Sequence, residues 1–583
     1  MSGRIPDVYG PGTWTDATFT PITSDTHRIF RHLASITPGF TDSPTLLSKV
    51  SFITKEGYPL LPGPLKLSSV AAALHGMAGV VASEILTLRS PSSSPDRTVT
   101  IDVTHAALWL ASVATVFLDG NDLATHAAEK IPLGLGRDWE MGWHSTPLKI
   151  RGTGIYPTRT PGVWYQLHGS LDVPPVLRSI GIILDPDEPA GIDTPDKAAT
   201  HIAKHTAKFS AEELEMKNLM GGFCGSICWT PHQWNESSMG KSLARHPLVN
   251  ATRHHVAWSP APPAPFPPFP EHENDRRPLV GVKVVELTRV IAGPQIGTLL
   301  AAFGADVVRV NAPHLPDINT LQLSLNAGKR TVGLDLRDQE DRKYLHDLIK
   351  DCDVFVQGFR LNTLNKYGLS FERLVQQRSE TGRGLVYVSE NCYGPDGYYA
   401  ERPGWQQIAD CASGAAHVIG RALGLPDGEC VLPALPVTDM STGLAGAVAT
   451  MMALRDRAKH GGSYKVHAAL VAVNTFTLSK EVGLYPPEVV RETQERFGFG
   501  PMRASHHVLD LLGNVYVGWK RVLGEYLEED SGLFQSFDNS PFGGRRLSIL
   551  RPVVRFSDEE SSPEWRSPSV PYAYEKKEEV AFR

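Results

Sequence analysis

The chain has 583 residues, of which 41% are hydrophobic and 21% are charged, as in an ordinary soluble globular protein. Its net charge of −6 argues against a chain built to bind nucleic acid or an anionic membrane surface. The six cysteines are too few for a disulfide scaffold, and Cys224 and Cys228 lack the His/Cys partners of a zinc site. We therefore expect buried thiols in a reducing compartment and no bound metal.

The first part of the chain, residues 1–148, contains one strongly helical stretch. An alanine-rich run from Ser69 to Leu88 predicts a helix, and Val99 to Val103 predicts a strand after a polar break. The start of the chain lacks the apolar core of a signal peptide, and no uninterrupted apolar run reaches bilayer length. The expected location is cytoplasmic, without a membrane partner, and a peroxisomal or mitochondrial location stays open.

Residues 149–256 predict a small α+β domain. An aromatic strand pattern from Gly162 to Leu171 precedes two helical stretches, around Ala198 to Lys208 and Ala211 to Leu219. Residues 257–277 are rich in proline and charge, which is typical of a semi-rigid linker.

Beyond the linker, residues 278–483 alternate between strand and helix patterns. Val282 to Leu287 is a continuous apolar run of the kind buried in a parallel sheet. Later strands are expected at Asp306 to Val310, Val354 to Val356 and Leu385 to Ser389, with a helix at Arg342 to Asp351. This alternation predicts a doubly wound, Rossmann-like α/β domain. No G-x-G-x-x-G follows the first strand, so we do not expect NAD.

Asp439 stands where an apolar, proline-broken run meets an alanine-rich helix. Ser441 or Thr442 can cap this helix, whose positive end then lies beside the carboxylate. Gly443 and Gly446 allow another backbone or a ligand to come close. An α/β protein places a nucleophile or a base at such a corner, but an aspartate that only caps the helix has the same pattern.

The helix after Asp439 has a counterpart in the first half. His75 to Arg89 aligns without a gap with Thr442 to Asp456, and both segments are followed by a polar break and a strand that ends in His-Ala-Ala. Duplication explains this match, although alanine-rich helices also match by chance. The alignment places Ala72 opposite Asp439, so residues 1–148 would be a degenerate copy without the carboxylate.

Five motifs of the second half resemble the class III CoA-transferase family (CaiB/BaiF type), which includes 2-methylacyl-CoA racemases. They are PLVGVKVVELTRVIAGP (278–294), LLAAFGADVVRV (299–310), NAGKRTVGLDLR (326–337), DVFVQGFRLNTLNKYGL (353–369) and PVTDMSTGL (436–444). The resemblance covers about residues 278–475. Weaker likenesses indicate a C-terminal return segment, residues 484–583, and a small domain that opens near residue 156.

The resemblance also bears on assembly. In the family the small domain follows the α/β half, whereas here it precedes it, so the two halves of the chain complement one another. Family members form interlocked dimers of chains. We therefore expect either an intramolecular pseudo-dimer or a homodimer.

The resemblance implies that Asp439 is a nucleophile that attacks the thioester of an acyl-CoA donor. A mixed anhydride and then an aspartyl-CoA thioester would form, and CoA would pass to a carboxylic acid acceptor. Coenzyme A is the implied co-substrate, with backbone amides near Gly443 stabilising the oxyanion. The implied contacts are Val290, Ile291 and Ala292 along the CoA chain, and Leu334, Arg337 and Lys366 near the adenosine phosphates. Singly, each basic residue is equally typical of a solvated surface charge.

Trp405 stands where the racemase branch has a histidine base, in Gly404-Trp405-Gln406. An indole cannot shuttle a proton, so two-base racemisation is disfavoured. Trp405 is expected either to line the acyl pocket or to pack in the core. The predicted function is an acyl-CoA:carboxylate CoA-transferase. The alternatives are an acyl-CoA racemase or epimerase, and a catalytically inactive CoA-binding protein.

Overall fold

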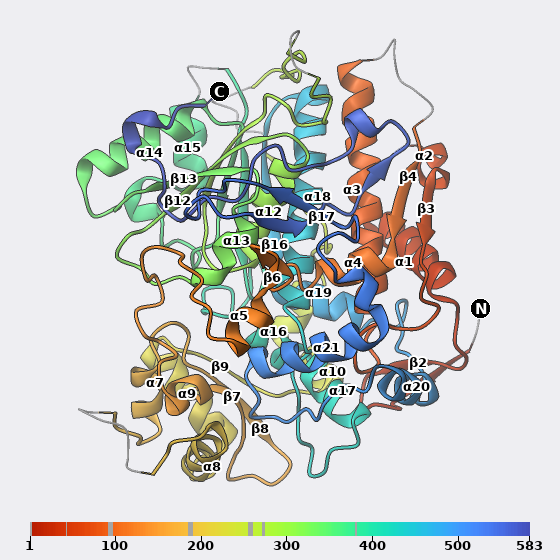
Figure 1. Ribbon diagram of the computed structural model, residues 1–583, viewed down its shortest axis with the longest axis vertical. Helices are drawn as coiled ribbons and strands as arrows, with labels where there is room; N and C mark the ends of the chain where they lie inside the picture. Colours follow the sequence, from red (N-terminus) through yellow and green to blue (C-terminus); the bar gives the residue numbers. More distant parts are fainter. Residues whose placement is uncertain are drawn as a thin grey trace.

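The computed structural model describes residues 3–41, 43–90, 97–184, 191–254, 261–270, 274–378 and 382–582. A seven-stranded sheet organises the molecule (Figure 1). Its order is β10 (Asn250–His254), β16 (Ser463–Ala469), β15 (Val386–Asn391), β14 (Val354–Gln357), β11 (Lys283–Leu287), β12 (Asp306–Asn311) and β13 (Lys329–Gly333). Strands β11 to β16 are parallel and follow the 3-2-1-4-5-6 order of a doubly wound sheet, which confirms the predicted fold class.

Both faces of this sheet are covered, which explains the continuous apolar strands. In β11, Val284 packs into one apolar cluster with α18 (Val437–His460), whereas Val285 packs into a second cluster with α14 (Gln339–Asp351), because successive side chains of a strand point to opposite faces. The helices of this domain are α12 (Ala292–Ala302), α13 (Gln322–Leu325), α14 (Gln339–Asp351), α15 (Phe371–Gln377), α16 (Gln406–Ser413), α17 (Ala415–Ala422), α18 (Val437–His460) and α19 (Leu470–Thr477).

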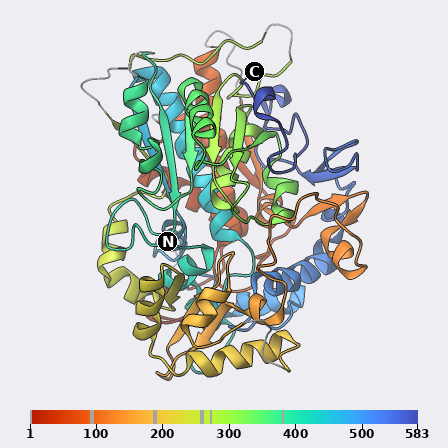
Figure 2. The ribbon, with the colours of Figure 1, turned by 90° about the vertical axis from the view of Figure 1, so that its left-hand side faces the viewer.

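A second, small domain has its own antiparallel sheet and its own apolar cluster, and Figure 2 shows it at the lower end of the molecule, below the seven-stranded sheet. Its strands are β7 (Thr153–Pro157), β8 (Trp164–His168) and β9 (Cys224–Ile227). The helices of this stretch are α6 (Pro147–Arg151), α7 (Pro174–Ser179), α8 (Pro195–Thr206), α9 (Ala211–Gly221), α10 (Pro231–Glu236) and α11 (Ser238–Leu243). The structure differs from the expected boundary at residue 256, because β10 leaves the small domain and pairs with β16 in the large sheet.

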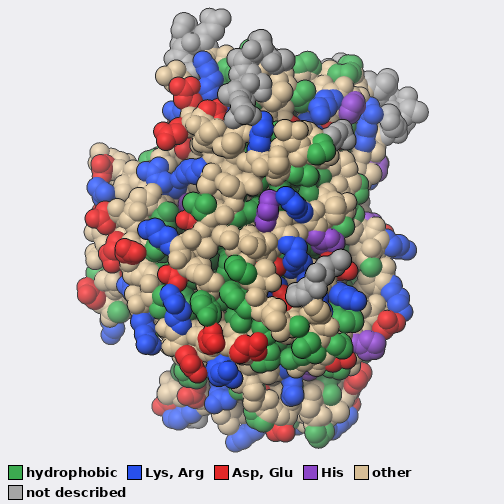
Figure 3. Space-filling view, turned by 90° about the vertical axis from the view of Figure 1, so that its right-hand side faces the viewer, with side chains coloured by type: hydrophobic (Ala, Val, Ile, Leu, Met, Phe, Trp, Pro, Cys, Tyr) green, Lys and Arg blue, Asp and Glu red, His purple; other side chains and the backbone are tan. Residues whose placement is uncertain are grey.

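Two long helices, α3 (Leu67–Arg89) and α18, pack against each other at the centre of the main core. By length and composition each is apolar enough to cross a membrane, but 89% and 94% of their most apolar windows are buried inside the protein. These two helices are apolar because they are buried in the core of the protein. On the face shown in Figure 3, basic and acidic side chains are interspersed, in keeping with the small net charge.

The two ends of the chain share sheets. Strand β5 (Val116–Leu118) pairs with β18 (Leu547–Leu550), and β4 (Val99–Asp102) pairs with β19 (Arg555–Phe556). The remaining elements are β1 (Arg4–Pro6), β2 (Trp14–Asp16), α1 (Ile22–Ile36), α2 (Pro44–Ser48), β3 (Val50–Ile53), α4 (Val103–Trp109), β6 (Asn121–Asp122), α5 (Leu123–Ala128), α20 (Pro487–Phe497), α21 (Val508–Leu523) and β17 (Phe534–Phe537). Residues 1–148 and 484–583 are therefore interleaved.

The proline-rich linker is held to the body of the protein in the parts described, residues 261–270 and 274–277. Arg89, the last residue of α3, donates hydrogen bonds to the carbonyl oxygens of Pro267 (2.6 Å) and Pro278 (2.9 Å). Its guanidinium also lies 3.8 Å from the ring centroid of Phe269. These contacts make this stretch a fixed connection between the halves.

The two core helices have similar surroundings. Helix α3 is followed by β4 and α4, and α18 by β16 and α19. Strand β4 lies between a parallel neighbour, β3, and an antiparallel one, β19, while β16 lies between parallel β15 and antiparallel β10. This likeness agrees with a duplication, which stays a prediction.

Candidate active site

Asp439 lies in the first turn of α18, which begins at Val437, two residues before the aspartate. The expectation that Ser441 or Thr442 caps the helix is wrong, because both lie inside it. The cap comes from Gln406 of α16, whose side-chain oxygen accepts the backbone N–H groups of Thr438 and Asp439 at 3.0 Å each. Within the described parts of the chain, the Asp439 carboxylate has no hydrogen-bond partner. It is therefore not an N-cap, and it is available to a ligand.

Two cavities meet at Asp439. One, of about 350 Å³, is lined on one side by Arg289, Arg360 and Glu390, and we call it the cationic cavity. The other, of about 540 Å³, is lined by Leu133, Leu135, Ile318, Val508 and Leu509 among others, and we call it the apolar cavity. Six residues line both, namely Ser170, Leu171, Val290, Ile291, Trp405 and Asp439. A group bonded to Asp439 can thus extend into either cavity.

Three carboxyl groups gather near the start of α18. Burial raises the pKa of Asp439 well above its usual range, and the nearby Glu390 and Asp410 raise it further. Burial also raises the pKa of Glu390 to about 8 and that of Asp410 to about 7. Asp410 is fully buried and accepts hydrogen bonds from Thr438 Oγ1 and Asn474 Nδ2, both at 2.8 Å, so it supports the helix start. With a pKa of about 8, the Glu390 carboxyl group on the cavity wall is neutral at pH 7.

Two arginines give the cationic cavity its charge. Arg289 donates to the carbonyl oxygen of Pro316, and Arg360 donates to that of Gly222 at 3.1 Å. Neither forms an ion pair with a carboxylate among the residues that the structure describes, whereas Arg402, on the same wall, is paired with Glu215. Neither arginine was predicted from the sequence as a site residue, although Arg289 and Arg360 stand inside two of the quoted motifs.

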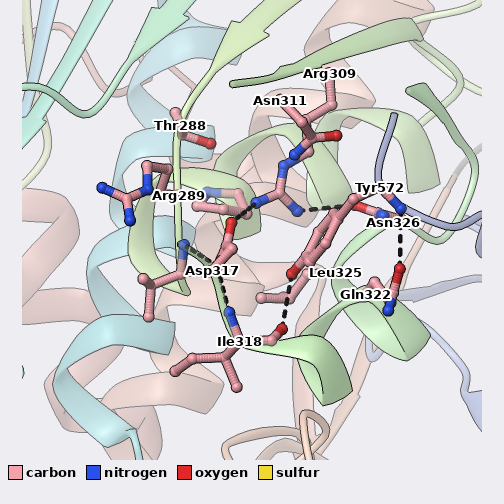
Figure 4. A network of polar contacts seen from close by, with 12 residues as sticks. Thr288, Arg289, Arg309, Asn311, Asp317, Ile318, Gln322, Leu325, Asn326 and Tyr572 are labelled. Carbon is pink, nitrogen blue, oxygen red and sulfur yellow. Dashed lines mark hydrogen bonds and ion pairs between the residues drawn. The ribbon is translucent and has the colours of Figure 1, made fainter. Parts of the chain in front are cut away.

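The turn that carries Val290 is strained and is held by a buried network (Figure 4). Val290 has φ of 65°, a rare value for a β-branched residue. Its N–H donates to Asp317 Oδ1 (3.3 Å), which also accepts the N–H of Ile318 (2.8 Å). Arg309, fully buried, pairs with Asp317 at 3.4 Å and lies 4.9 Å from the ring centroid of Tyr572. The C-terminal segment thus supports the wall shared by the two cavities.

Some of the predicted contacts line the cavities and others do not. Val290, Ile291 and Ala292 line the cationic cavity, and their contact with the CoA chain stays a prediction. Ala292 opens α12, whose first-turn N–H groups have no acceptor within the helix. Trp405 lines both cavities, donates its indole N–H to Ser170 Oγ (3.0 Å) and stacks on the ring of His168.

The residues expected near the adenosine phosphates lie outside both cavities. Leu334 is 1% exposed and belongs to the apolar cluster beneath the sheet edge, so its side chain cannot contact a ligand. Arg337 is exposed and paired with Asp335 at 2.6 Å, and Lys366 is exposed beside Tyr367. Both basic residues follow the carboxyl ends of strands, β13 and β14, on the edge where α/β folds bind ligands.

Gly443 is a packing residue, contrary to the expectation that amides near it stabilise an oxyanion. It lies inside α18 against α12, where an added Cβ would stand 2.5 Å from Gln295 Cβ and 2.8 Å from Ala292 O. Its N–H lies beyond the first turn and bonds within the helix. The first-turn amides of Thr438 and Asp439 are taken by Gln406.

We therefore expect Gly443→Ala to destabilise the protein by about 1–2 kcal/mol, because overpacking outweighs a helix-propensity gain of about 1 kcal/mol. Gly513→Ala is the matched control, since Gly513 lies inside α21 with nothing within 4 Å of an added Cβ. That variant should be stabilised by about 0.5–1 kcal/mol. Urea unfolding measures the stability of both variants. An equal change in the free energy of unfolding for the two would contradict the packing role of Gly443.

His168 lines the apolar cavity together with Asp439. The Nδ1 atom of His168 accepts the N–H of Ser170 (2.9 Å), its Nε2 bonds Gln407 (3.1 Å), and burial lowers its pKa to about 3. His168 is therefore neutral. No group of three or more His, Cys, Asp or Glu side chains that could hold a metal ion occurs among the described residues.

Comparisons with known proteins show which proteins this chain is similar to. The model of CoA-transferase family III matches residues 279–506. An acyl-CoA transferase of Gibberella moniliformis is 44% identical over 571 residues, which are 97% of this chain and 97% of that protein. The acetyl-coenzyme A transferase nodX of Hypoxylon pulicicidum is 31% identical over 534 residues, 88% of this chain and 86% of that protein. A crystal structure of a CAIB/BAIF family protein from Brucella suis matches 50% of this chain and 96% of its own, with 24% identity and a TM-score of 0.36.

Proposed function

This chain belongs to CoA-transferase family III, and we propose that it moves CoA from an acyl-CoA thioester to a free carboxylic acid through a covalent intermediate on Asp439. One observation carries the proposal: the Asp439 carboxylate, which has no hydrogen-bond partner among the described residues, stands where a cationic cavity and an apolar cavity meet. Relatives named acyl-CoA transferases along nearly the whole chain support it.

In the proposed mechanism the Asp439 carboxylate attacks the carbonyl carbon of the donor thioester, the C–S bond breaks, and a mixed anhydride and CoA thiolate result. The thiolate then attacks the Asp439 acyl carbon, which forms an aspartyl-CoA thioester and releases the donor acid. The acceptor carboxylate attacks this thioester and displaces the thiolate again. Attack of the thiolate on the acceptor carbonyl gives the new acyl-CoA and restores Asp439.

The chain offers groups for the charges that develop. Arg289 and Arg360 can neutralise the thiolate side and the phosphates of CoA. The first-turn N–H groups of α12, beside Ile291 and Ala292, can donate to the oxyanion. Arg337 and Lys366, on the same sheet edge, are proposed to contact the nucleotide end of CoA.

Hydroxylamine trapping tests this proposal. Incubation with an acyl-CoA and hydroxylamine should leave Asp439 as a hydroxamate, which peptide mass spectrometry would locate. A racemase would instead exchange the α-hydrogen for deuterium, and an inactive CoA-binding protein would do neither. If no acyl-CoA gave a hydroxamate at Asp439, the proposed covalent intermediate would be contradicted.

The pH dependence of the reaction should depend on Glu390. With a pKa of about 8, its carboxyl group is neutral below pH 8 and becomes negative above it. A second negative charge opposes ionisation of Asp439 and departure of the thiolate, so kcat/KM should fall above about pH 8. In Glu390→Gln, kcat/KM at pH 7 should stay within about threefold of the wild type, and the fall above pH 8 should vanish. If kcat/KM of Glu390→Gln still fell above pH 8, the fall would be due to the titration of another group.

The active site is proposed to be complete in one chain, as an intramolecular pseudo-dimer. Residues from 133–144, from the small domain, from the α/β domain and from 507–509 all line the apolar cavity. Sedimentation equilibrium should therefore find active protein with the mass of one chain, 63.7 kDa. Activity confined to a species of twice that mass would favour a homodimer. The cytoplasmic location stays a prediction.

A further inference from the structure

The apolar cavity carries no positive side chain to bind a second carboxylate. Its apolar wall includes Leu133, Leu135, Trp143, Ile318 and Leu509, and none of the described residues that line it is lysine or arginine. At about 540 Å³ it is the larger of the two cavities, with room for a chain well beyond two carbons.

Apart from Asp439, the acidic groups that line this cavity, Asp138 and Glu140, already have hydrogen-bond partners and would repel a further anion. Glu140 accepts the N–H of Asn319 (3.0 Å) and pairs with His144 (3.1 Å). Asp138 accepts the N–H of Glu140 (2.8 Å) and a hydrogen bond from the Asn319 amide (3.2 Å). Any positive charge on His144 is thus balanced locally by Glu140.

The other two histidines of the cavity supply no cation either. His507 accepts the N–H of Leu509 at 3.3 Å, and its burial lowers its pKa to about 4. Burial lowers the pKa of His168 to about 3, and its Nδ1 accepts the N–H of Ser170, so this ring is neutral. A carboxylate placed in this cavity would therefore lose its hydration without gaining a lysine or arginine partner among the described residues, which is unfavourable.

On the premise of the proposed function, we infer that the acyl group exchanged at Asp439 is an apolar monocarboxylic chain longer than acetyl. The chain extends from the thioester carbonyl into the apolar cavity, while the sulfur and the rest of CoA extend into the cationic cavity. Dicarboxylic acyl groups are disfavoured, because no lysine or arginine among the described residues of this cavity would meet their second carboxylate.

The half-reaction tests this inference separately from the proposed function. The rate of hydroxylamine trapping at Asp439 would be compared for acetyl-, butyryl-, hexanoyl- and octanoyl-CoA and for succinyl- and glutaryl-CoA. Each further buried methylene should raise kcat/KM about fourfold, which corresponds to about 0.8 kcal/mol, until the cavity is filled. Hexanoyl-CoA should exceed glutaryl-CoA at least tenfold. Equal or faster trapping from glutaryl-CoA would overturn the inference and leave the proposed function standing, whereas no trapping from any thioester would remove both.

Two matched variants locate the chain. Val508, at the start of α21, lines the apolar cavity only, whereas Val517, in the same helix, is 68% exposed and lines neither cavity. Val508→Trp should slow trapping from octanoyl-CoA at least tenfold and from butyryl-CoA less than threefold. Val517→Trp should change neither. If Val508→Trp slowed trapping from octanoyl-CoA and butyryl-CoA equally, or slowed neither, the acyl chain would not lie beside Val508.

Discussion

Replacing Asp439 by asparagine should abolish CoA transfer while the fold is retained. An amide cannot be acylated into the anhydride and thioester that the mechanism requires, so we expect kcat to fall at least about 10⁴-fold, as when a covalent nucleophile is removed. The Asp439 side chain has no hydrogen-bond partner among the described residues, so the nearly isosteric change breaks no contact in the fold. Steady-state transfer between an acyl-CoA and a free acid measures the loss.

The same variant should be at least as stable as the wild type at pH 7. Because burial raises the pKa of Asp439, the folded state binds its proton more tightly than the unfolded chain, and stability falls as pH rises from the ordinary pKa toward the raised one. Asparagine removes that penalty, so its melting temperature should exceed that of the wild type at pH 7 and match it near pH 4.

Asp456→Asn is the matched control, since Asp456 lies near the other end of α18 and contacts neither cavity. It should keep its activity. Residual activity of Asp439→Asn within tenfold of the wild type would show that another group is acylated.

The second large effect is expected at Arg309. This residue is fully buried between Glu286 (3.3 Å) and Asp317 (3.4 Å), and it donates to Asn326 Oδ1 at 2.8 Å. Arg309→Met leaves Asp317 as a buried charge without its partner, and losing one member of a buried ion pair costs about 3–5 kcal/mol. Denaturant unfolding should show this loss. Activity should also fall, because Asp317 holds the strained Val290 turn.

Two controls separate this network from general disturbance. Tyr572→Phe removes one hydrogen bond to the carbonyl of Ile318 (3.1 Å) and should cost about 1 kcal/mol. Arg546→Ala breaks an exposed pair with Glu529 and should cost less than about 1 kcal/mol. If Arg309→Met proved no less stable than Tyr572→Phe, groups other than Arg309 would be stabilising the buried carboxylates of Glu286 and Asp317.

Local patterns in the sequence were sufficient to predict the α/β fold and to single out Asp439 as the candidate nucleophile. The apolar runs that became β11, β12, β14 and β15 have a strand period and are buried on both faces, so each is recognisable without its neighbours. Val290, Ile291 and Ala292 follow the first such strand directly and reach the cavity because the carboxyl ends of parallel strands meet at one edge.

Contacts between distant segments decided the rest. Gln406 caps α18 from 32 residues away, and Glu390 lines a cavity wall with Asp439 only after folding. Leu334 became a core residue and Gly443 a packing residue because of what lies against them, which no local pattern records. The sequence by itself therefore determined the sheet, the family and the candidate nucleophile, since these follow from periodicity and short motifs. The charge, shape and pKa values of the site were decided by the tertiary structure alone, because they depend on burial and on side chains brought together from all parts of the chain.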